Sequence, residues 1–207
     1  MDAAQGRAAV LGRTADTGQV LDYQRYRLGF RAIARNTDSR TLIVGPLPKN
    51  VFCGNSILVL NQGETFTDAQ TLVVQALLNS FALDFYIRQT VSANINMFYI
   101  YQLPVPRLTE RDAAFWPIVR RVARLVCTTP EFDALAHTVG LSSHRDGAIN
   151  DVERAQLRAE LDGLVAHLYH LTEQEFAHML DTFPIVPEAV RVAAQNAYRD
   201  VARGLVM

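Results

Sequence analysis

The pattern of apolar residues changes character along the chain, and its first part has the short runs typical of strands. Runs at residues 26–34, 40–47 and 56–60 are rich in aromatic and branched side chains, and the first alternates apolar with basic positions. Turn-forming residues separate the first two runs at positions 35–39 (RNTDS), so we expect a hairpin there. The loop from Asn61 to Glu64 follows the third run.

A longer apolar stretch follows the predicted strands. From Thr67 to Ile87 the chain is apolar on almost every side, which predicts one helix buried inside the domain. A polar patch with two asparagines comes next, and Met97–Tyr101 (MFYIY) has the composition of a buried strand. The two prolines of residues 103–106 (LPVP) end that strand.

After Pro106 the periodicity becomes helical. Cap residues and prolines mark the expected helix starts, and the predicted helices span residues 109–127, 130–139, 151–168, 172–180 and 187–203. We therefore predict an α+β fold, with a small mixed β-sheet or hairpin and a buried helix in the N-terminal half, followed by a helical C-terminal half. The expected division is an irregular segment at 1–20, an α/β core at 21–107 and a helical subdomain at 108–207.

The amino-acid composition argues against a membrane-spanning, secreted or disulfide-bonded protein. The chain has 207 residues, 49% of them hydrophobic, which is enough for a globular core. No apolar run is long enough to cross a membrane, and the N-terminus lacks the features of a secretion signal. Cys53 and Cys127 are too few for a disulfide framework. We therefore expect a cytoplasmic protein without a membrane partner.

The charge distribution restricts how nucleic acid is bound. The net charge is −1, whereas a domain that holds DNA by itself normally has a positive excess. However, several basic residues cluster in the first quarter of the chain, where Lys49 is the only lysine of the sequence. This asymmetry permits a nucleic-acid surface on the first half only.

Motifs for catalysis are missing from the sequence. It contains no nucleophile elbow, no glycine-rich phosphate loop and no N/D-P-P-Y/F tetrapeptide of amino-methyltransferases. His167 and His170 are one turn apart, but no carboxylate spacing completes a metal site. Asp162, Glu175 and Asp181 are interpreted as caps or solvated charges rather than as an acid–base pair. We expect neither catalysis nor a bound metal or cofactor in this chain.

Three blocks of the sequence resemble one family. The first covers residues 31–48 (RAIARNTDSRT and LIVGPLP), and the second includes LNS at 78–80, Arg88, NIN at 94–96 and LPVP at 103–106. The third includes ER at 153–154, LD at 161–162 and DTFPIV at 181–186. Together they resemble the C-terminal target-recognition region of type II restriction enzyme-methyltransferases of the Eco57I and MmeI kind. Related phage-defence adenine-N6 DNA methyltransferases share this region.

The resemblance implies a DNA target-recognition region that acts with an adenine-N6 methyltransferase domain or subunit. S-adenosylmethionine would be bound by that methyltransferase, and the partner of this chain would be double-stranded DNA. Arginine suits phosphates and the guanine O6/N7 edge, and asparagine suits adenine or phosphate. The candidate DNA-binding residues are Arg31, Arg35, Asn36, Arg40, Lys49, Arg88, Asn94 and Asn96.

A motif shared by enzymes with different target sequences cannot itself select the sequence that is read. We therefore expect the shared residues to form scaffold or phosphate contacts, and the base readers to lie in loops such as 61–64 or 89–92. An alternative hypothesis is a helical subunit for protein–protein assembly, which the acidic, amphipathic second half and the near-neutral charge favour.

Overall fold

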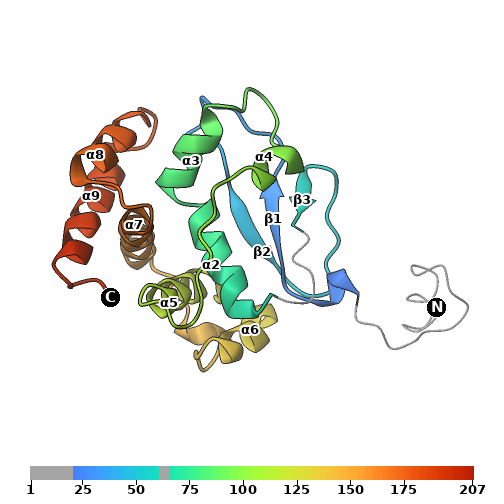
Figure 1. Cartoon of the computed structure of the whole chain (residues 1–207). Coiled ribbons are helices and arrows are strands. Elements are labelled where there is room, and N and C mark those ends of the chain that lie inside the picture. The colour runs from blue at the N-terminus through green and yellow to red at the C-terminus, as the bar shows by residue number, and fades with distance from the viewer. Residues whose placement is uncertain (1–20, 61–65) are drawn as a thin grey trace, which may run out of the picture.

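The computed structural model describes residues 21–60 and 66–207 and combines a three-stranded antiparallel sheet with helices (Figure 1). The central strand β1 (Arg27–Arg31) pairs with β2 (Val44–Leu47) on one side and with β3 (Ile57–Val59) on the other. Helices make up most of the second half of the chain. The predicted α+β class is therefore confirmed, whereas the predictions for residues 1–20 and 61–64 lie outside the described residues.

The sheet follows from the alternation in the sequence. Leu28 and Phe30 are almost completely buried, and Phe30 lies opposite Val44 of β2 and Leu58 of β3. The other face of β1 is less open than the alternation predicts, because Arg27 is only 6% exposed. Its guanidinium pairs with Asp22 at 3.1 Å, so the short 3-10 helix η1 (Asp22–Gln24) covers that face.

The single helix predicted from Thr67 to Ile87 is wrong, since the structure divides it into α2 (Asp68–Leu78) and α3 (Phe81–Arg88). Ser80 caps the second helix by accepting a hydrogen bond from the backbone N–H of Leu83 at 3.3 Å. The Asn79 side chain bonds both backbone groups of Val44 in β2, at 3.0 and 2.9 Å. Short polar side chains compete with helical hydrogen bonds, and here they end α2 against the sheet.

The strand predicted at Met97–Tyr101 is also wrong, because these residues form the short helix α4. Asn96 provides its N-cap through a hydrogen bond from the N–H of Phe98 at 3.0 Å. Only Ile100 of this helix is buried, whereas Phe98 is 64% exposed and Tyr101 is 72% exposed. The aromatic run therefore forms a half-buried helix, with Met97 and Tyr99 packed against the core and Phe98 and Tyr101 facing solvent.

The helices of the second half begin near the predicted caps. They are α5 (Phe115–Val126), η2 (Pro130–Phe132), α6 (Asp133–Thr138), η3 (His144–Asp146), α7 (Asp151–Leu168), α8 (Glu173–Asp181) and α9 (Glu188–Ala202). The capping box of Thr172 and Glu175 starts α8 as predicted. Helix α5 starts later than predicted, because Thr109 and Asp112 bond each other in a separate turn. Pro117 then lies in the first turn of α5, where its missing N–H costs least.

Helix α2 connects the two halves of the molecule, since it contacts β1 and β2 as well as α5 and α7 (Figure 1). The main hydrophobic core accordingly includes Leu28 and Phe30 from the sheet together with Ile118 and Val122 from α5. A second cluster joins α3, α7, α8 and α9 around Phe81. No helix within residues 21–60 and 66–207 has the length and apolar character to span a membrane.

Candidate nucleic-acid interface and its supporting network

Four of the predicted DNA-binding residues gather at one end of the sheet. Arg35 and Asn36 lie in the turn after β1, and Asn94 and Asn96 lie in the loop before α4; all four are exposed. Two backbone hydrogen bonds join the two segments. The N–H of Ala34 donates to the carbonyl of residue 93 at 3.2 Å, and the N–H of residue 95 donates to the carbonyl of residue 32 at 2.8 Å. We name the exposed surface of residues 35–37 and 92–96 the sheet-end surface.

Asp38 shapes the turn that carries Arg35. Its carboxylate accepts the backbone N–H of Arg35 at 3.2 Å and pairs with the guanidinium of Arg31 at 2.9 Å. Arg31 also donates to the carbonyl of Arg40 at 3.2 Å. Arg31 therefore fixes the turn and is neutralised there, whereas the Arg35 side chain has no acidic partner among the described residues.

Lys49 lies away from the sheet-end surface. It follows β2 and is exposed at the end of the sheet where Arg27 pairs with Leu47, opposite the end that carries Arg35. Its ammonium group sits 4.7 Å from the ring centroid of Tyr26, within the range of a cation–π contact. The structure therefore does not bring Lys49 together with the other predicted residues.

Arg40 and Arg88 surround a buried carboxylate that the sequence analysis did not single out. Asp84 of α3 is fully buried and accepts the backbone N–H groups of Thr41 and Leu42 at 3.0 and 2.9 Å. Its second oxygen lies 3.3 Å from Nε of Arg40 and 3.9 Å from an Nη atom of Arg88. Burial raises the pKa of Asp84, and Arg40, the backbone donors and Arg88 act against this rise.

Both arginines make further contacts inside the fold. Arg88 donates to the carbonyl of Asp38 at 2.9 Å and lies 3.9 Å from the ring centroid of Phe183. Arg40 lies 4.1 Å above the ring of Phe81 and donates to the carbonyl of Asn79. A guanidinium held in this way cannot reach a phosphate without leaving the fold. Among the predicted residues, those that are exposed and form no salt bridge within the described residues are therefore those of the sheet-end surface and Lys49.

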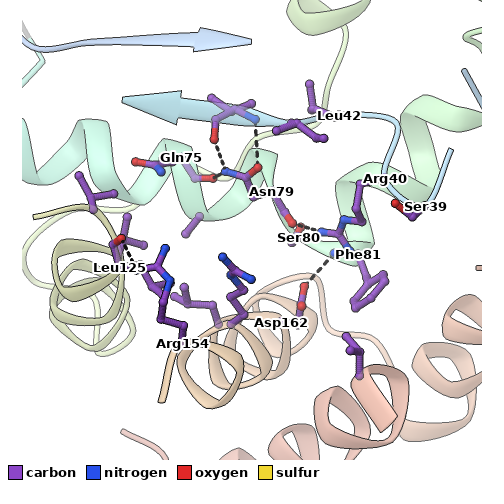
Figure 2. Close-up of a pocket in the computed structure, with 18 of the residues that line it drawn as sticks. Ser39, Arg40, Leu42, Gln75, Asn79, Ser80, Phe81, Leu125, Arg154 and Asp162 are labelled. Carbon is purple, nitrogen blue, oxygen red and sulfur yellow. Dashed lines mark hydrogen bonds between the residues drawn. The ribbon is translucent and has the colours of Figure 1, made fainter. Parts of the chain in front are cut away.

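Asp162 extends the network to the C-terminal half. Figure 2 shows it on α7, directed toward the start of α3, where it accepts the backbone N–H of Phe81 at 2.8 Å. Asp162 is therefore partly buried and not a solvated charge, and it acts as a cap by accepting an N–H in the first turn of a helix other than its own. A hint lay in the sequence, because Asp162 belongs to the third block of the resemblance.

The three blocks of the resemblance meet in this network. The first block contributes Arg40 and Thr41, the second contributes Ser80 and Arg88, and the third contributes Asp162, Thr182 and Phe183. Segments far apart in the sequence thereby hold the turn after β1 against α3. These residues of the three blocks therefore have structural roles within the fold.

Residues 89–92, expected to read bases, continue from α3 toward the sheet-end surface. Gln89, Thr90 and Ser92 are exposed, whereas Val91 is buried in the main core. The other expected reading loop, at 61–64, lies outside the described residues.

The histidines considered as metal ligands have other surroundings. Nε2 of His167 lies 2.9 Å from the carbonyl of Tyr198, and the two rings stack with centroids 4.1 Å apart. Across the described ranges of the chain, no three histidine, cysteine or acidic side chains converge as a metal site would require.

The chain was compared with protein-family models, characterised proteins and solved structures. None of them matches.

The pH dependence of stability offers a test of the Asp162 contact. Burial raises the pKa of Asp162 to about 6, although Arg40 and the N–H of Phe81 lower it. The unfolded value is about 3.9, so the folded state binds this proton more tightly. Protonation of Asp162 therefore stabilises the folded state. This stabilisation is complete below pH ~4 and is lost as pH rises through about 6. We expect wild type to lose stability over this range relative to Asp162→Asn, which still offers an oxygen to Phe81.

Urea unfolding at several pH values measures this difference. Asp181→Asn serves as the control, because the side chain of Asp181 is 78% exposed and its removal should leave the pH profile nearly unchanged. A stability difference between wild type and Asp162→Asn that is constant from pH 4 to 7 would contradict the raised pKa.

Proposed function

We propose that this chain is the DNA sequence-recognition domain of a restriction-modification or phage-defence adenine-N6 DNA methyltransferase, and that it is non-catalytic by itself. The supporting observation is the convergence of the three resembling blocks on one buried network around Asp84. Scattered similarity would have no reason to meet in space. A shared scaffold that holds an exposed turn and loop suits enzymes that read different sequences with one fold.

The sheet-end surface has the chemistry for holding DNA, beside the loop of residues 89–92 that is expected to read the bases. Arg35 carries an exposed guanidinium without an acidic partner in the described parts of the chain, and exposed asparagines lie beside it at positions 36, 94 and 96. Arginine and asparagine side chains both bind phosphate oxygens, which is the contact expected of residues in a shared motif. With a net charge of −1, the domain would rely on a methyltransferase neighbour for most phosphate neutralisation.

Selection of bound duplexes from a randomised DNA pool, followed by sequencing, tests the proposal directly. We expect an enriched motif of a few base pairs at near-physiological salt. Arg35→Ala combined with Asn94→Ala should weaken DNA binding roughly tenfold or more and to a similar degree for all sequences, since a hydrogen bond to a charged group such as a phosphate is worth about 1.5–3 kcal/mol. Arg120→Ala is the matched control, because Arg120 is exposed on α5, which does not contribute to the sheet-end surface.

The outcome distinguishes the proposed function from assembly. If no motif is enriched, the selection is repeated with the methyltransferase encoded beside this chain. Absence of enrichment in that complex would contradict DNA recognition by this chain. Equal affinity of the Arg35/Asn94 variant and wild type would contradict DNA contact by the sheet-end surface. The first of these outcomes would favour the helical assembly subunit instead.

A further inference from the structure

A pocket of about 730 Å³ lies between the sheet and the C-terminal helices, beside the Asp84 network (Figure 2). Its walls come from β2 and the residues before it, from α2, α5 and α7, and from the segment that enters α9. The volume falls within the range of small-molecule sites. Most of the lining is apolar, as with Leu42, Val44, Val122, Val126 and Leu161.

Most polar groups in the pocket are already occupied by the fold. Asn79 is bonded to Val44 and to the carbonyl of Gln75, and Arg40 is held by Asp84. The side-chain oxygen of Gln75 is different. Gln75 is only 8% exposed, and this oxygen is buried without any hydrogen-bond partner. This oxygen has almost no accessible surface, so a ligand in the pocket cannot reach it.

Helix α7 brings to the pocket two cations that have no acidic partner within residues 21–60 and 66–207. The neighbouring acids Glu153 and Glu160 are neutralised by Arg124 and Arg121 of α5. Arg154 donates to two backbone carbonyls, at 3.0 and 2.7 Å, and so keeps its charge uncompensated.

Arg158 lines the pocket one turn further along α7 and forms no salt bridge within the described chain. Residues four apart on a helix lie on the same face, so both guanidinium groups face one ligand. The acid of the pocket, Asp162, already accepts the N–H of Phe81, so the two arginines are the charged groups left for a ligand.

We propose that this pocket binds a small organic anion with an apolar body. Arg154 and Arg158 hold the anionic group, and the aliphatic walls cover the body. This site is separate from the sheet-end surface and does not depend on DNA recognition.

Anilinonaphthalene sulfonate is a suitable probe, because it combines a sulfonate with a fused apolar ring system, and its fluorescence rises in apolar surroundings. We expect saturable binding to wild type. Arg158→Ala should raise the dissociation constant about tenfold, the usual cost of losing a charged hydrogen-bond partner. Arg120→Ala, on the exposed face of α5, should have no effect.

Phenylnaphthylamine, the same ring system without the sulfonate, separates anion recognition from apolar capture. It should bind wild type more weakly than the sulfonate and should not respond to Arg158→Ala. Val190→Trp at the partly exposed rim should obstruct both probes. Equal affinity of the two probes, or sulfonate binding unchanged by both Arg158→Ala and Val190→Trp, would overturn the proposal.

Discussion

Replacing Asp84 with alanine is expected to lower the free energy of unfolding by about 3–5 kcal/mol, the range observed when one partner of a buried ion pair is removed. The substitution leaves the N–H groups of Thr41 and Leu42 without their acceptor. It also leaves the guanidinium groups of Arg40 and Arg88 without a counter-charge in a buried place. Urea unfolding followed by circular dichroism gives the measurement.

Asp200→Ala is the matched control for this substitution. Asp200 is partly exposed in the last turn of α9 and lies 3.8 Å from Arg203, so its loss should change stability by no more than about 0.5 kcal/mol. Asp84→Asn keeps one oxygen for the backbone donors and should fall between alanine and wild type. Equal stability of wild type and Asp84→Ala would show that the carboxylate does not hold the network.

Gly163→Val is expected to destabilise the protein by about 1–3 kcal/mol, the range for inserting atoms into a well-packed interior. Gly163 lies where α7 passes α9. A Cβ atom at this position would lie 2.8 Å from the carbonyl carbon of Ala197 and 2.8 Å from the nitrogen of Tyr198. Both contacts are with backbone atoms, which no side-chain rotation can relieve, so the two helices must separate. Thermal unfolding of the variant measures the loss.

Gly45→Ala is the control for Gly163→Val. A Cβ at position 45 meets no atom within 4 Å, and the position lies in β2 without a positive φ. The stability of this variant should stay close to wild type, since alanine also restricts the unfolded chain. If Gly163→Val unfolds at the same temperature as Gly45→Ala, the close contact between α7 and α9 does not limit side-chain size there.

Local signals in the sequence predicted much of the fold. The helices α7, α8 and α9 start at Asn150, Thr172 and Pro187, whose preference for a helix start is set by near neighbours. The same physics was present at Asn79–Ser80 and Asn96, but the surrounding apolar residues suggested a continuous helix and a buried strand. In both places the helix start is determined by a capping residue and not by the hydrophobic pattern.

The candidate site was harder to predict, because a charged residue in the sequence does not show whether its side chain will be exposed or buried in the folded protein. Arg35 and Asn94 are exposed as expected. Arg40 and Arg88, in contrast, pair with the buried carboxylate of Asp84, which accepts backbone N–H groups from residues more than forty positions earlier in the chain. One local signal for Asp84 existed, since a single acid in an apolar helix with an arginine four residues later favours a buried pair. The partnership with Thr41 required the fold itself.

The Asp84 network joins residues that are far apart in the sequence, and this separation affects how the protein folds during synthesis. During synthesis, β1, β2 and α3 leave the ribosome before Asp162 and Phe183 exist. Until those residues are added, Phe81 lacks the Phe183 ring that packs against it, and its N–H lacks the Asp162 acceptor. The nascent N-terminal half therefore exposes an apolar surface and an incompletely covered ion cluster, so its folding waits for the C-terminal helices.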